Sequence, residues 1–81
     1  MDDGSIRERI SALVQEERAL RDRLASQEIT PQEEQARLRE VEVQLDQCWD
    51  LLRQRDAKRE FGEDPDTAQV RDPRTVEGYL G

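Results

Sequence analysis

Apolar residues recur at helical spacing in two segments of the chain, and a short polar stretch separates them. The first series follows steps of 4, 3, 7 and 4 residues, and its members are Ile6, Ile10, Leu13, Leu20 and Leu24. The second follows steps of 3, 4, 3 and 4, and its members are Leu38, Val41, Leu45, Cys48 and Leu52. Such steps place side chains on one face of an α-helix, as in the heptads of coiled coils. The pattern predicts two helices, each with one apolar face.

The first helix is predicted to begin at Ser5 and to end near Ala25. Ser5 is followed three residues later by Glu8, which is the form of a capping box. In that motif each of the two side chains accepts a hydrogen bond from the backbone N–H of the other residue. The apolar series stops before Ala25, and residues 26–29 form a short connection. The predicted helix therefore covers about residues 5–25.

The start of the second helix carries the clearest local signal in the chain. Thr30 has the side chain of an N-cap, and Pro31 suits the first helical position, where a backbone N–H has no partner. Glu33 completes a second capping box. No glycine or proline interrupts the pattern until Gly62, which favours the left-handed conformation that ends helices. The second helix is predicted over about residues 30–61.

A connection of four or five residues holds two consecutive helices antiparallel. Matching the two apolar faces, as in a coiled coil, gives facing positions whose numbers sum to about 58. The predicted pairs are Leu20 with Leu38, Glu17 with Val41, Leu13 with Leu45, Ile10 with Cys48, and Ile6 with Leu52. The sequence thus predicts an all-α fold, an antiparallel two-helix hairpin that is coiled-coil-like and occupies residues 1–61.

Glu17 is the polar member of the first apolar face, and it has two interpretations. In the first, its carboxylate extends out of the interface toward Arg21, Arg37 or Gln44. In the second, it fixes the register of the two helices, as a buried polar residue does in a coiled coil. The first interpretation is favoured, because long acidic side chains reach water easily.

Residues 62–81 are predicted to form a polar, largely irregular C-terminal tail. Two Asp-Pro pairs favour turns, and the segment has neither a helical nor a strand period. Val76, Tyr79 and Leu80 are predicted to fold back onto the open end of the second helix, where apolar surface exceeds what the first helix covers. If they do not, this segment is a candidate linear motif for an external partner.

The composition narrows the class of protein. The chain has 81 residues, of which 33% are apolar and 41% charged, so it makes one domain with a small core. Its net charge of −7 disfavours a general affinity for nucleic acid or anionic lipid. No stretch approaches the ~20 apolar residues of a membrane span, and the acidic start does not resemble a signal peptide. We expect a cytoplasmic protein without membrane contact.

The sequence offers little for catalysis, because it contains no histidine and a single cysteine. We predict no catalytic residue, no cofactor and no metal ligand, and therefore no enzyme. Cys48 lies on the apolar face and is predicted to be a small buried hydrophobe. Glu42, Asp46 and Asp50 follow one another at steps of four and are predicted to form a solvated outer face.

A cluster of basic residues lies near the end of the second helix. Its members are Arg53, Arg55, Lys58 and Arg59. Such a cluster can hold a phosphate group, so the alternative function is a regulator that binds an anionic nucleotide or RNA. Asp56 and Glu60 interleave with the basic residues, and Phe61 is the aromatic nearby. A solvated helix face is therefore the favoured interpretation, and nucleic acid is not the expected partner.

The apolar face is wider at the open end of the hairpin than near the loop. Val14 widens the first helix, and Trp49 and Leu51 flank Cys48 and Leu52 on the second. A two-helix seam uses only the two central positions of each heptad, so something else must cover this end. The candidates are the chain's own tail, a second copy, or another helical protein. The interface candidates are Val14, Trp49, Leu51, Leu52 and Tyr79.

We therefore expect a non-enzymatic helical interaction module, an adaptor or regulator that acts through helix packing. Self-association into a dimer with a four-helix arrangement is the leading hypothesis. Docking of a different helical protein onto the same residues remains open.

The chain also resembles a family of small uncharacterised actinobacterial proteins. The resemblance is carried by residues 43–55, by Ile29-Thr30-Pro31, by Gly62-Glu63-Asp64-Pro65 and by Val76-Glu77-Gly78-Tyr79. It covers nearly the whole chain. The resemblance implies a domain of unknown function, so no activity, cofactor or catalytic residue comes from it.

Overall fold

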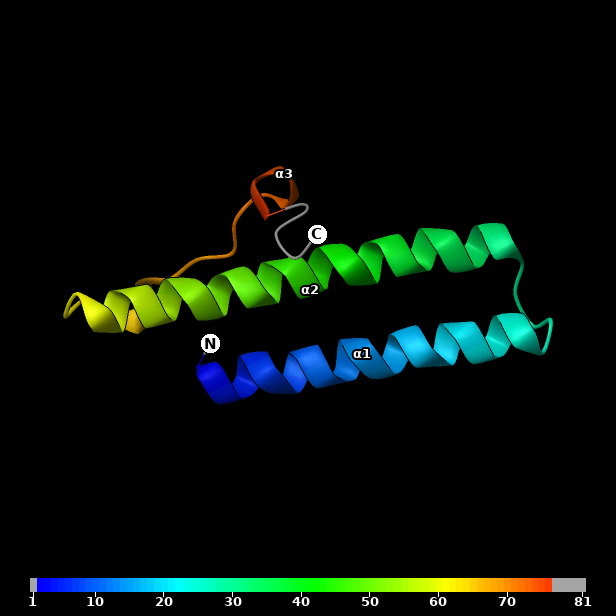
Figure 1. The fold of residues 1–81 in the computed structure, drawn as a ribbon, viewed down its shortest axis with the longest axis horizontal. Helices are drawn as coiled ribbons and strands as arrows, with labels where there is room; N and C mark the ends of the chain where they lie inside the picture. Colours follow the sequence, from blue (N-terminus) through cyan, green and yellow to red (C-terminus); the bar gives the residue numbers. More distant parts are fainter. Residues whose placement is uncertain (1, 77–81) are drawn as a thin grey trace.

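The computed structural model shows an all-α hairpin with a short tail against one side (Figure 1). It describes residues 2–76, and for Thr75 and Val76 it describes the backbone only. Two long helices run antiparallel, and the chain then turns back along the second of them. The elements are α1 (Asp3–Ala25), α2 (Pro31–Glu60), the 3-10 turn η1 (Pro65–Thr67) and α3 (Pro73–Val76). The predicted all-α, antiparallel hairpin is confirmed.

The start of α1 differs from the prediction. Asp2, not Ser5, is the N-cap, and its carboxylate accepts a hydrogen bond of 2.8 Å from the backbone N–H of Ser5. Ser5 therefore lies inside the first turn. Aspartate caps a helix as well as serine does, and its charge also favours the positive end of the helix dipole. The helix gains two residues, and Asp3 enters its first turn.

The start of α2 agrees with the prediction. The Thr30 hydroxyl oxygen accepts a hydrogen bond of 3.1 Å from the backbone N–H of Glu33, and Pro31 is the first helical residue. The Glu33 carboxylate closes the motif through the side chain, because it accepts a hydrogen bond of 3.2 Å from the Thr30 hydroxyl. These two hydrogen bonds fix Thr30 and Glu33 relative to each other, and so they fix the direction in which α2 leaves the loop.

Both long helices end in the same six-residue motif. After α1, the N–H of Gln27 binds the carbonyl of Leu24 and the N–H of Glu28 binds that of Arg23. After α2, Gly62 and Glu63 repeat these two bonds. The motif requires a left-handed residue, and here the positions are held by Gly62 (φ +73°) and Gln27 (φ +62°). Glycine adopts this conformation freely, whereas Gln27 is strained in it.

Replacing Gln27 by glycine is expected to stabilise the hairpin by about 0.5–1 kcal/mol, because the left-handed strain outweighs the added freedom of the unfolded chain. Urea unfolding followed by circular dichroism measures the change. Gln27→Ala keeps the Cβ atom and the strain, so it is the matched control and should bring no gain. Equal stability of the glycine and alanine variants would contradict this account of the loop.

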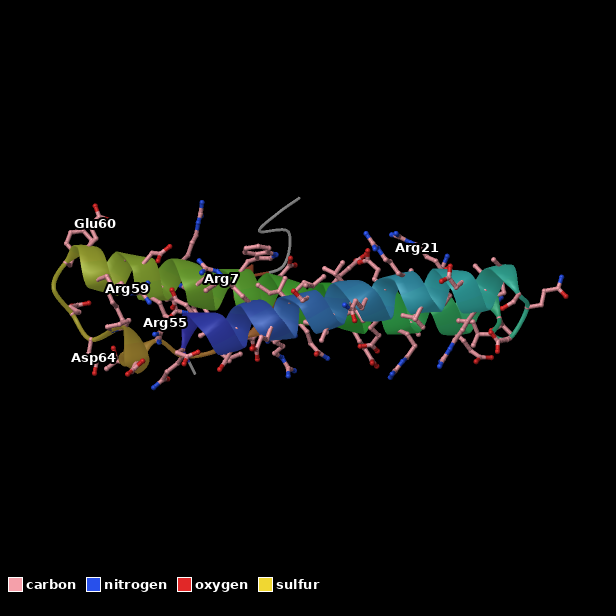
Figure 2. All side chains as sticks on the ribbon, turned by 90° about the horizontal axis from the view of Figure 1, so that it is seen from below. Arg7, Arg21, Arg55, Arg59, Glu60 and Asp64 are labelled. Carbon is pink, nitrogen blue, oxygen red and sulfur yellow. The ribbon has the colours of Figure 1, made fainter. Side chains whose placement is uncertain are left out.

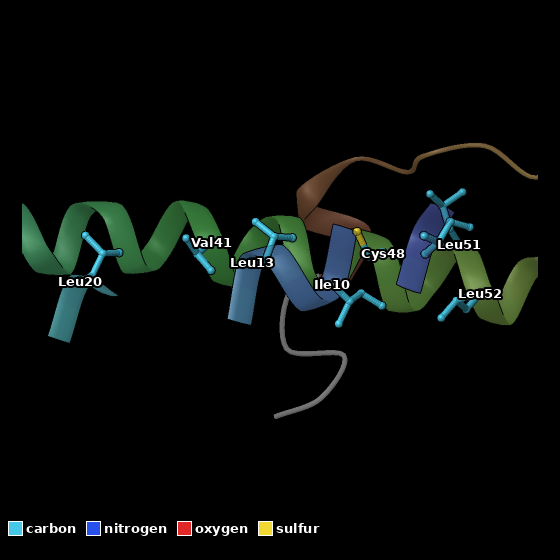
Figure 3. Close-up of a cluster of buried hydrophobic side chains, with 8 residues drawn as sticks. Ile10, Leu13, Leu20, Val41, Cys48, Leu51 and Leu52 are labelled. Carbon is cyan, nitrogen blue, oxygen red and sulfur yellow. The ribbon is translucent and has the colours of Figure 1, made fainter. Parts of the chain in front are cut away.

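The core lies along the seam between α1 and α2. Its buried residues are Ile6, Ile10, Leu13, Leu20, Val41, Cys48, Leu51 and Leu52 (Figure 3). The partly buried residues Ile29, Leu38, Leu45 and Ala68 pack against them. Ile10 lies at the level of Cys48, as the predicted register requires. Asp3 and Arg55 form an ion pair, and their position numbers also sum to the value predicted for facing residues. The two heptad faces therefore meet in register along the seam.

The tail folds back along α2, as Figure 1 shows for η1 and α3. Ala68 packs against the core, and the backbone of Gln69 exchanges two hydrogen bonds with the side chain of Gln54, at 2.7 and 3.3 Å. The side-chain amide of Gln47 donates to the carbonyl of Arg71 at 3.1 Å. The chain's own tail thus covers one side of α2 through these residues. The predicted anchors Tyr79 and Leu80, and the side chain of Val76, lie outside the described part of the chain.

Candidate interaction surface

The hairpin has two flanks, one on each side of the seam, and the tail lies on one of them. Arg9 marks this closed flank on α1, because its guanidinium donates to the Oε1 atom of Gln44 at 3.1 Å. Gln47 and Gln54 mark it on α2, since both bind the tail. Helical spacing places Val14 on the other side of the α1 face from Arg9. The opposite flank is therefore the one without the described tail residues.

The closed flank is fastened by a buried carboxylate, that of Asp50. Arg71 from the tail donates from Nη2 to Oδ1 at 2.6 Å and from Nε to Oδ2 at 2.8 Å. Gln54 donates to the same Oδ2 atom at 2.8 Å. Asp50 is only 1% exposed, so the two hydrogen bonds from Arg71 replace the water that would otherwise hydrate its carboxylate. The ion pair ties the tail to the middle of α2.

The prediction for Asp50 is wrong. The sequence pattern places Asp50 on a solvated helix face together with Glu42 and Asp46, but the residue is buried. Glu42 is exposed and Asp46 is half-buried, but Asp50 is buried by the tail. The helical spacing was right, and the error came from treating the tail as absent from this face. The position of Asp50 between Trp49 and Leu51, in an apolar run, could have indicated burial. A buried charge requires a partner of opposite charge. Arg71 is that partner.

The tail also changes the set of exposed apolar residues at the open end. Leu51 and Leu52 are both 7% exposed and belong to the core. Leu52 lies in the seam, and Leu51 lies on the side of Gln47 and Gln54, where the tail packs. The predicted wide apolar face is thus partly covered within the chain. Neither leucine is offered at the surface of the described structure.

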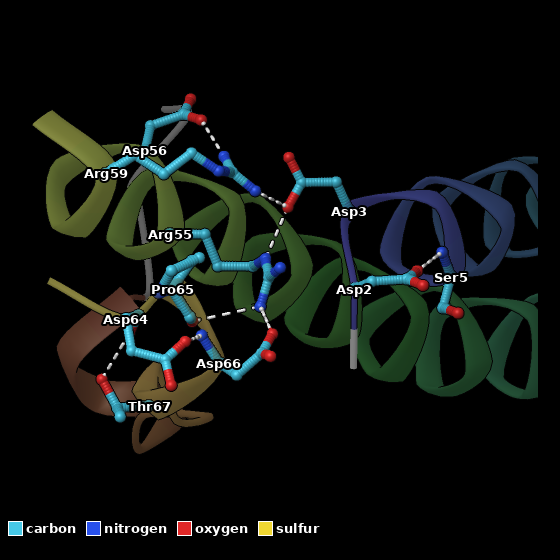
Figure 4. Close-up of polar contacts among 10 residues, drawn as sticks. All are labelled: Asp2, Asp3, Ser5, Arg55, Asp56, Arg59, Asp64, Pro65, Asp66 and Thr67. Carbon is cyan, nitrogen blue, oxygen red and sulfur yellow. Dashed lines mark hydrogen bonds and ion pairs between the residues drawn. The ribbon is translucent and has the colours of Figure 1, made fainter. Parts of the chain in front are cut away.

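Arg55 joins three separate parts of the chain at the open end (Figure 4). Its Nε group donates to Asp3 at the start of α1, and its Nη1 group donates to Asp66 at 2.9 Å and to the carbonyl of Pro65 at 3.1 Å. Arg59 donates to the same Asp3 oxygen at 2.6 Å. Arg55 is 5% exposed, so these bonds replace its hydration. The arginine fixes the first turn of α1 and η1 against α2.

The predicted basic cluster is divided among carboxylates of the same chain. Arg55 is buried with Asp3 and Asp66, and Arg59 pairs with Asp3 and Asp56. The Nζ atom of Lys58 lies 3.8 Å from a carboxylate oxygen of Glu63. Arg53 is exposed on the helix surface. The hydrogen bonds that Arg55 and Arg59 donate to Asp3 raise the pKa of both arginines, so both side chains keep their positive charge in this contact.

Acid is expected to weaken the contact between Asp3 and the two arginines. Hydrogen bonds from Arg59 and then Arg55 lower the pKa of Asp3 from 3.8 to about 2. A lowered pKa in the folded state means that the stabilisation is complete above the ordinary value and is lost as the pH falls through about 2. Urea midpoints measured from pH 5 downward should therefore fall more steeply in the wild type than in Asp3→Asn. Parallel curves for the two proteins would show that Asp3 does not contribute in this way.

The open flank carries two large apolar side chains that the described residues leave partly uncovered. Val14 on α1 is 39% exposed and Trp49 on α2 is 40% exposed. Arg7 and Arg21, which are seven residues before and after Val14, lie along the same edge of the hairpin (Figure 2). An exposed tryptophan on the same flank as a second exposed apolar side chain is typical of a protein interface. We call the residues Arg7, Val14, Arg21, Glu42, Trp49 and Asp56 the open flank.

Glu17 lies at the edge of the open flank and pairs with Arg21 at 3.3 Å. Its side chain is 23% exposed. The interpretation in which its carboxylate reaches out of the seam toward Arg21 is therefore confirmed.

Cys48 is 3% exposed and belongs to the core, as predicted. Burial raises the pKa of its thiol, and the guanidinium of Arg9 partly opposes this effect. Within residues 2–76, no group of three or more side chains that could bind a metal ion lies close together.

The described helices include none that is long and apolar enough to cross a membrane. The interface candidate Tyr79 falls outside the described residues.

The fold and this surface define a class, a small helical hairpin whose own tail closes one flank and leaves a tryptophan on the other. The chain belongs to the family described as Protein of unknown function (DUF2630), whose model matches residues 2–81. It is 56% identical over 72 residues to uncharacterised proteins of Mycobacterium bovis and Mycobacterium tuberculosis, covering 89% of this chain and 83% of theirs. The resemblance to small actinobacterial proteins is thereby confirmed. The comparison with solved structures finds no match.

Proposed function

We propose that the chain is a non-enzymatic helical interaction module, an adaptor or regulator, that pairs with a second copy of itself through the open flank. The observation that carries the proposal is the exposure of Trp49 and Val14 on the flank that the described tail does not cover. The tail, Asp50 and Arg71 fill the other flank. The surface for association is therefore one-sided.

Charge along the open flank supports a second copy as the occupant. On α1 the residues at steps of seven are Arg7, Val14 and Arg21, and on α2 they are Glu42, Trp49 and Asp56. Each helix thus presents an apolar residue between two charges, with positive charges on α1 and negative charges on α2. Opposite charges favour contact between α1 of one copy and α2 of the other. A two-fold axis parallel to the helices produces this pairing.

The register of the hairpin fixes what Trp49 would meet. Trp49 lies at the level of Arg9 and Ile10 of its own α1, since facing positions sum to about 58. A two-fold axis along the bundle preserves levels, so Trp49 of one copy enters between Arg7 and Val14 of the other. An arginine beside an indole adds a cation–π contact to the apolar burial. The result is a four-helix arrangement in which the described tail residues lie on the outside.

The non-enzymatic part of the proposal rests on how the buried polar groups are used. Asp50 and Arg55 are both engaged with partners from the same chain that hold its segments together. Catalytic groups are instead aimed at a site for a substrate. These residues stabilise the fold, and the exposed apolar residues provide the recognition.

Sedimentation equilibrium tests the proposal. The wild type should show twice the chain mass of 9.5 kDa, and Trp49→Gln should shift the population to the monomer. Phe61→Gln is the matched control, because Phe61 is 77% exposed but lies at the end of α2, away from the open flank. The dimer should persist at high salt, where capture of a phosphate backbone would weaken steeply. A monomeric wild type at high micromolar concentration would reject self-association.

Charge exchange separates a second copy from a different helical partner. Glu42→Arg alone should weaken the dimer, because it faces the arginines of α1 in the other copy. Adding Arg21→Glu to the same chain should restore much of the association, since both copies then carry the complementary pair. No restoration in the double variant would leave the flank as a surface for another protein.

A further inference from the structure

A cavity of about 250 Å³ lies on the closed flank, where α1, α2 and the tail meet. Its lining comes from all three, and the residues are Arg9, Gln44, Gln47, Cys48, Leu51 and Val70. It is separate from the open flank, because Arg9 and Val14 lie on opposite sides of the α1 face. It also uses none of the proposed dimer contacts.

The lining divides into an apolar floor and a polar edge. Cys48 and Leu51 are buried side chains, and Val70 is a tail residue that is 62% exposed. At the edge, Arg9 donates one hydrogen bond to Gln44, and a guanidinium has further N–H groups to offer. Gln47 binds the carbonyl of Arg71 and so holds the tail at the cavity. An apolar pocket with a few convergent polar groups is the usual form of a small-molecule site.

We propose that this cavity binds a small amphipathic carboxylate with an apolar body of about the size of one ring. An apolar cavity of about 150 Å³ accommodates benzene, so 250 Å³ leaves room for a ring and a carboxylate. Cys48, Leu51 and Val70 contact the apolar body, and the guanidinium of Arg9 pairs with the carboxylate. The ligand would also cover the exposed surface of Val70.

The chemistry of the edge favours a single negative charge. Arg9 is the cationic side chain of the lining, and its planar N–H groups match the two oxygens of a carboxylate. Gln44 and Gln47 can add neutral hydrogen bonds but no charge. The apolar floor excludes a ligand that consists of an anion alone, because such a ligand loses hydration without gaining apolar contact.

Titration of the ¹⁵N-labelled full chain with phenylacetate tests the site. The amide signals of Cys48, Leu51 and Val70 should shift together and saturate, and phenylacetate should slow alkylation of Cys48 by iodoacetamide. Arg9→Gln should weaken binding about tenfold, because it removes a charge-assisted contact at a partly hydrated edge. Arg9 is exposed, so this variant keeps the fold. Phenylacetamide, which has the same shape without the charge, should bind the wild type about tenfold more weakly than phenylacetate does.

Arg18→Gln is the matched control, because it removes an exposed arginine of α1 that does not line the cavity and should leave phenylacetate binding unchanged. Three results would overturn the proposal. One is the absence of saturable shifts at the cavity, and another is equal affinity of the wild type and Arg9→Gln for phenylacetate. The third is that inorganic phosphate produces the same shifts, since the site would then recognise an anion without an apolar body.

Discussion

Replacing Arg71 by glutamine is expected to lower the melting temperature by about 10 °C, although the residue lies in a tail of mostly irregular structure. The reason lies in Asp50, which is 1% exposed and would keep its negative charge without its bidentate partner. Gln54 alone cannot replace the two lost hydrogen bonds. Thermal unfolding followed by circular dichroism measures the loss. The tail would then detach from α2 together with Arg71.

A second substitution decides whether the buried charge is the cause. In the Asp50→Asn, Arg71→Gln double variant no charge is left unpaired, so its melting temperature should lie above that of Arg71→Gln alone. Arg74→Gln is the matched control, since Arg74 is an exposed arginine of the same tail. It should change the melting temperature little. If the double variant is the least stable protein of the set, the buried charge does not explain the effect.

Truncating Ile6 to alanine should cost about 3 kcal/mol, which corresponds to a fall in melting temperature of about 15 °C for a chain of this size. Ile6 is completely buried, and it belongs to the core between α1 and α2. The loss includes both apolar transfer and the cavity that the surrounding residues cannot fill. So small a core has few other contacts to compensate. Chemical unfolding of the purified variant gives the free energy directly.

Val70→Ala is the comparison for Ile6, because it removes methyl groups from a side chain that is 62% exposed. Its cost should stay below about 0.5 kcal/mol. Similar losses for the two variants would mean that the open end of the seam is less tightly packed than the burial of Ile6 indicates.

Much of the fold could be predicted from the sequence because its main signals are local or periodic. The steps of three and four residues define both helix faces, and Thr30, Pro31 and Gly62 mark boundaries through backbone chemistry. The start of α1 was misplaced by two residues because Asp2 and Ser5 are both good caps. Arg55 donates a hydrogen bond to Asp3 in the first turn, which favours the earlier cap, and no local pattern contains that tertiary bond.

The candidate site could be predicted only in part. Val14 and Trp49 were identified from the width of the apolar face, and the structure leaves both partly exposed. Leu51, Asp50 and Arg55 were expected at the surface or among solvated charges, and all three are buried. Each is covered by contacts with the tail or the first turn of α1, which have no periodicity. The contact of Arg71 with Asp50 was missed for the same reason.

The described tail residues lie along the half of α2 near the open end, so within residues 2–76 three segments pack together there and two segments pack together near the loop. Local unfolding should therefore begin at the loop end, where Leu24, Ile29 and Leu38 are only half-buried. Trp49 belongs to the thicker end, on a helix that Arg55 and Arg71 hold in place from the other side. A recognition surface on a rigid support loses less conformational entropy when it associates. The tail can thus strengthen binding on the flank opposite to it without touching the partner.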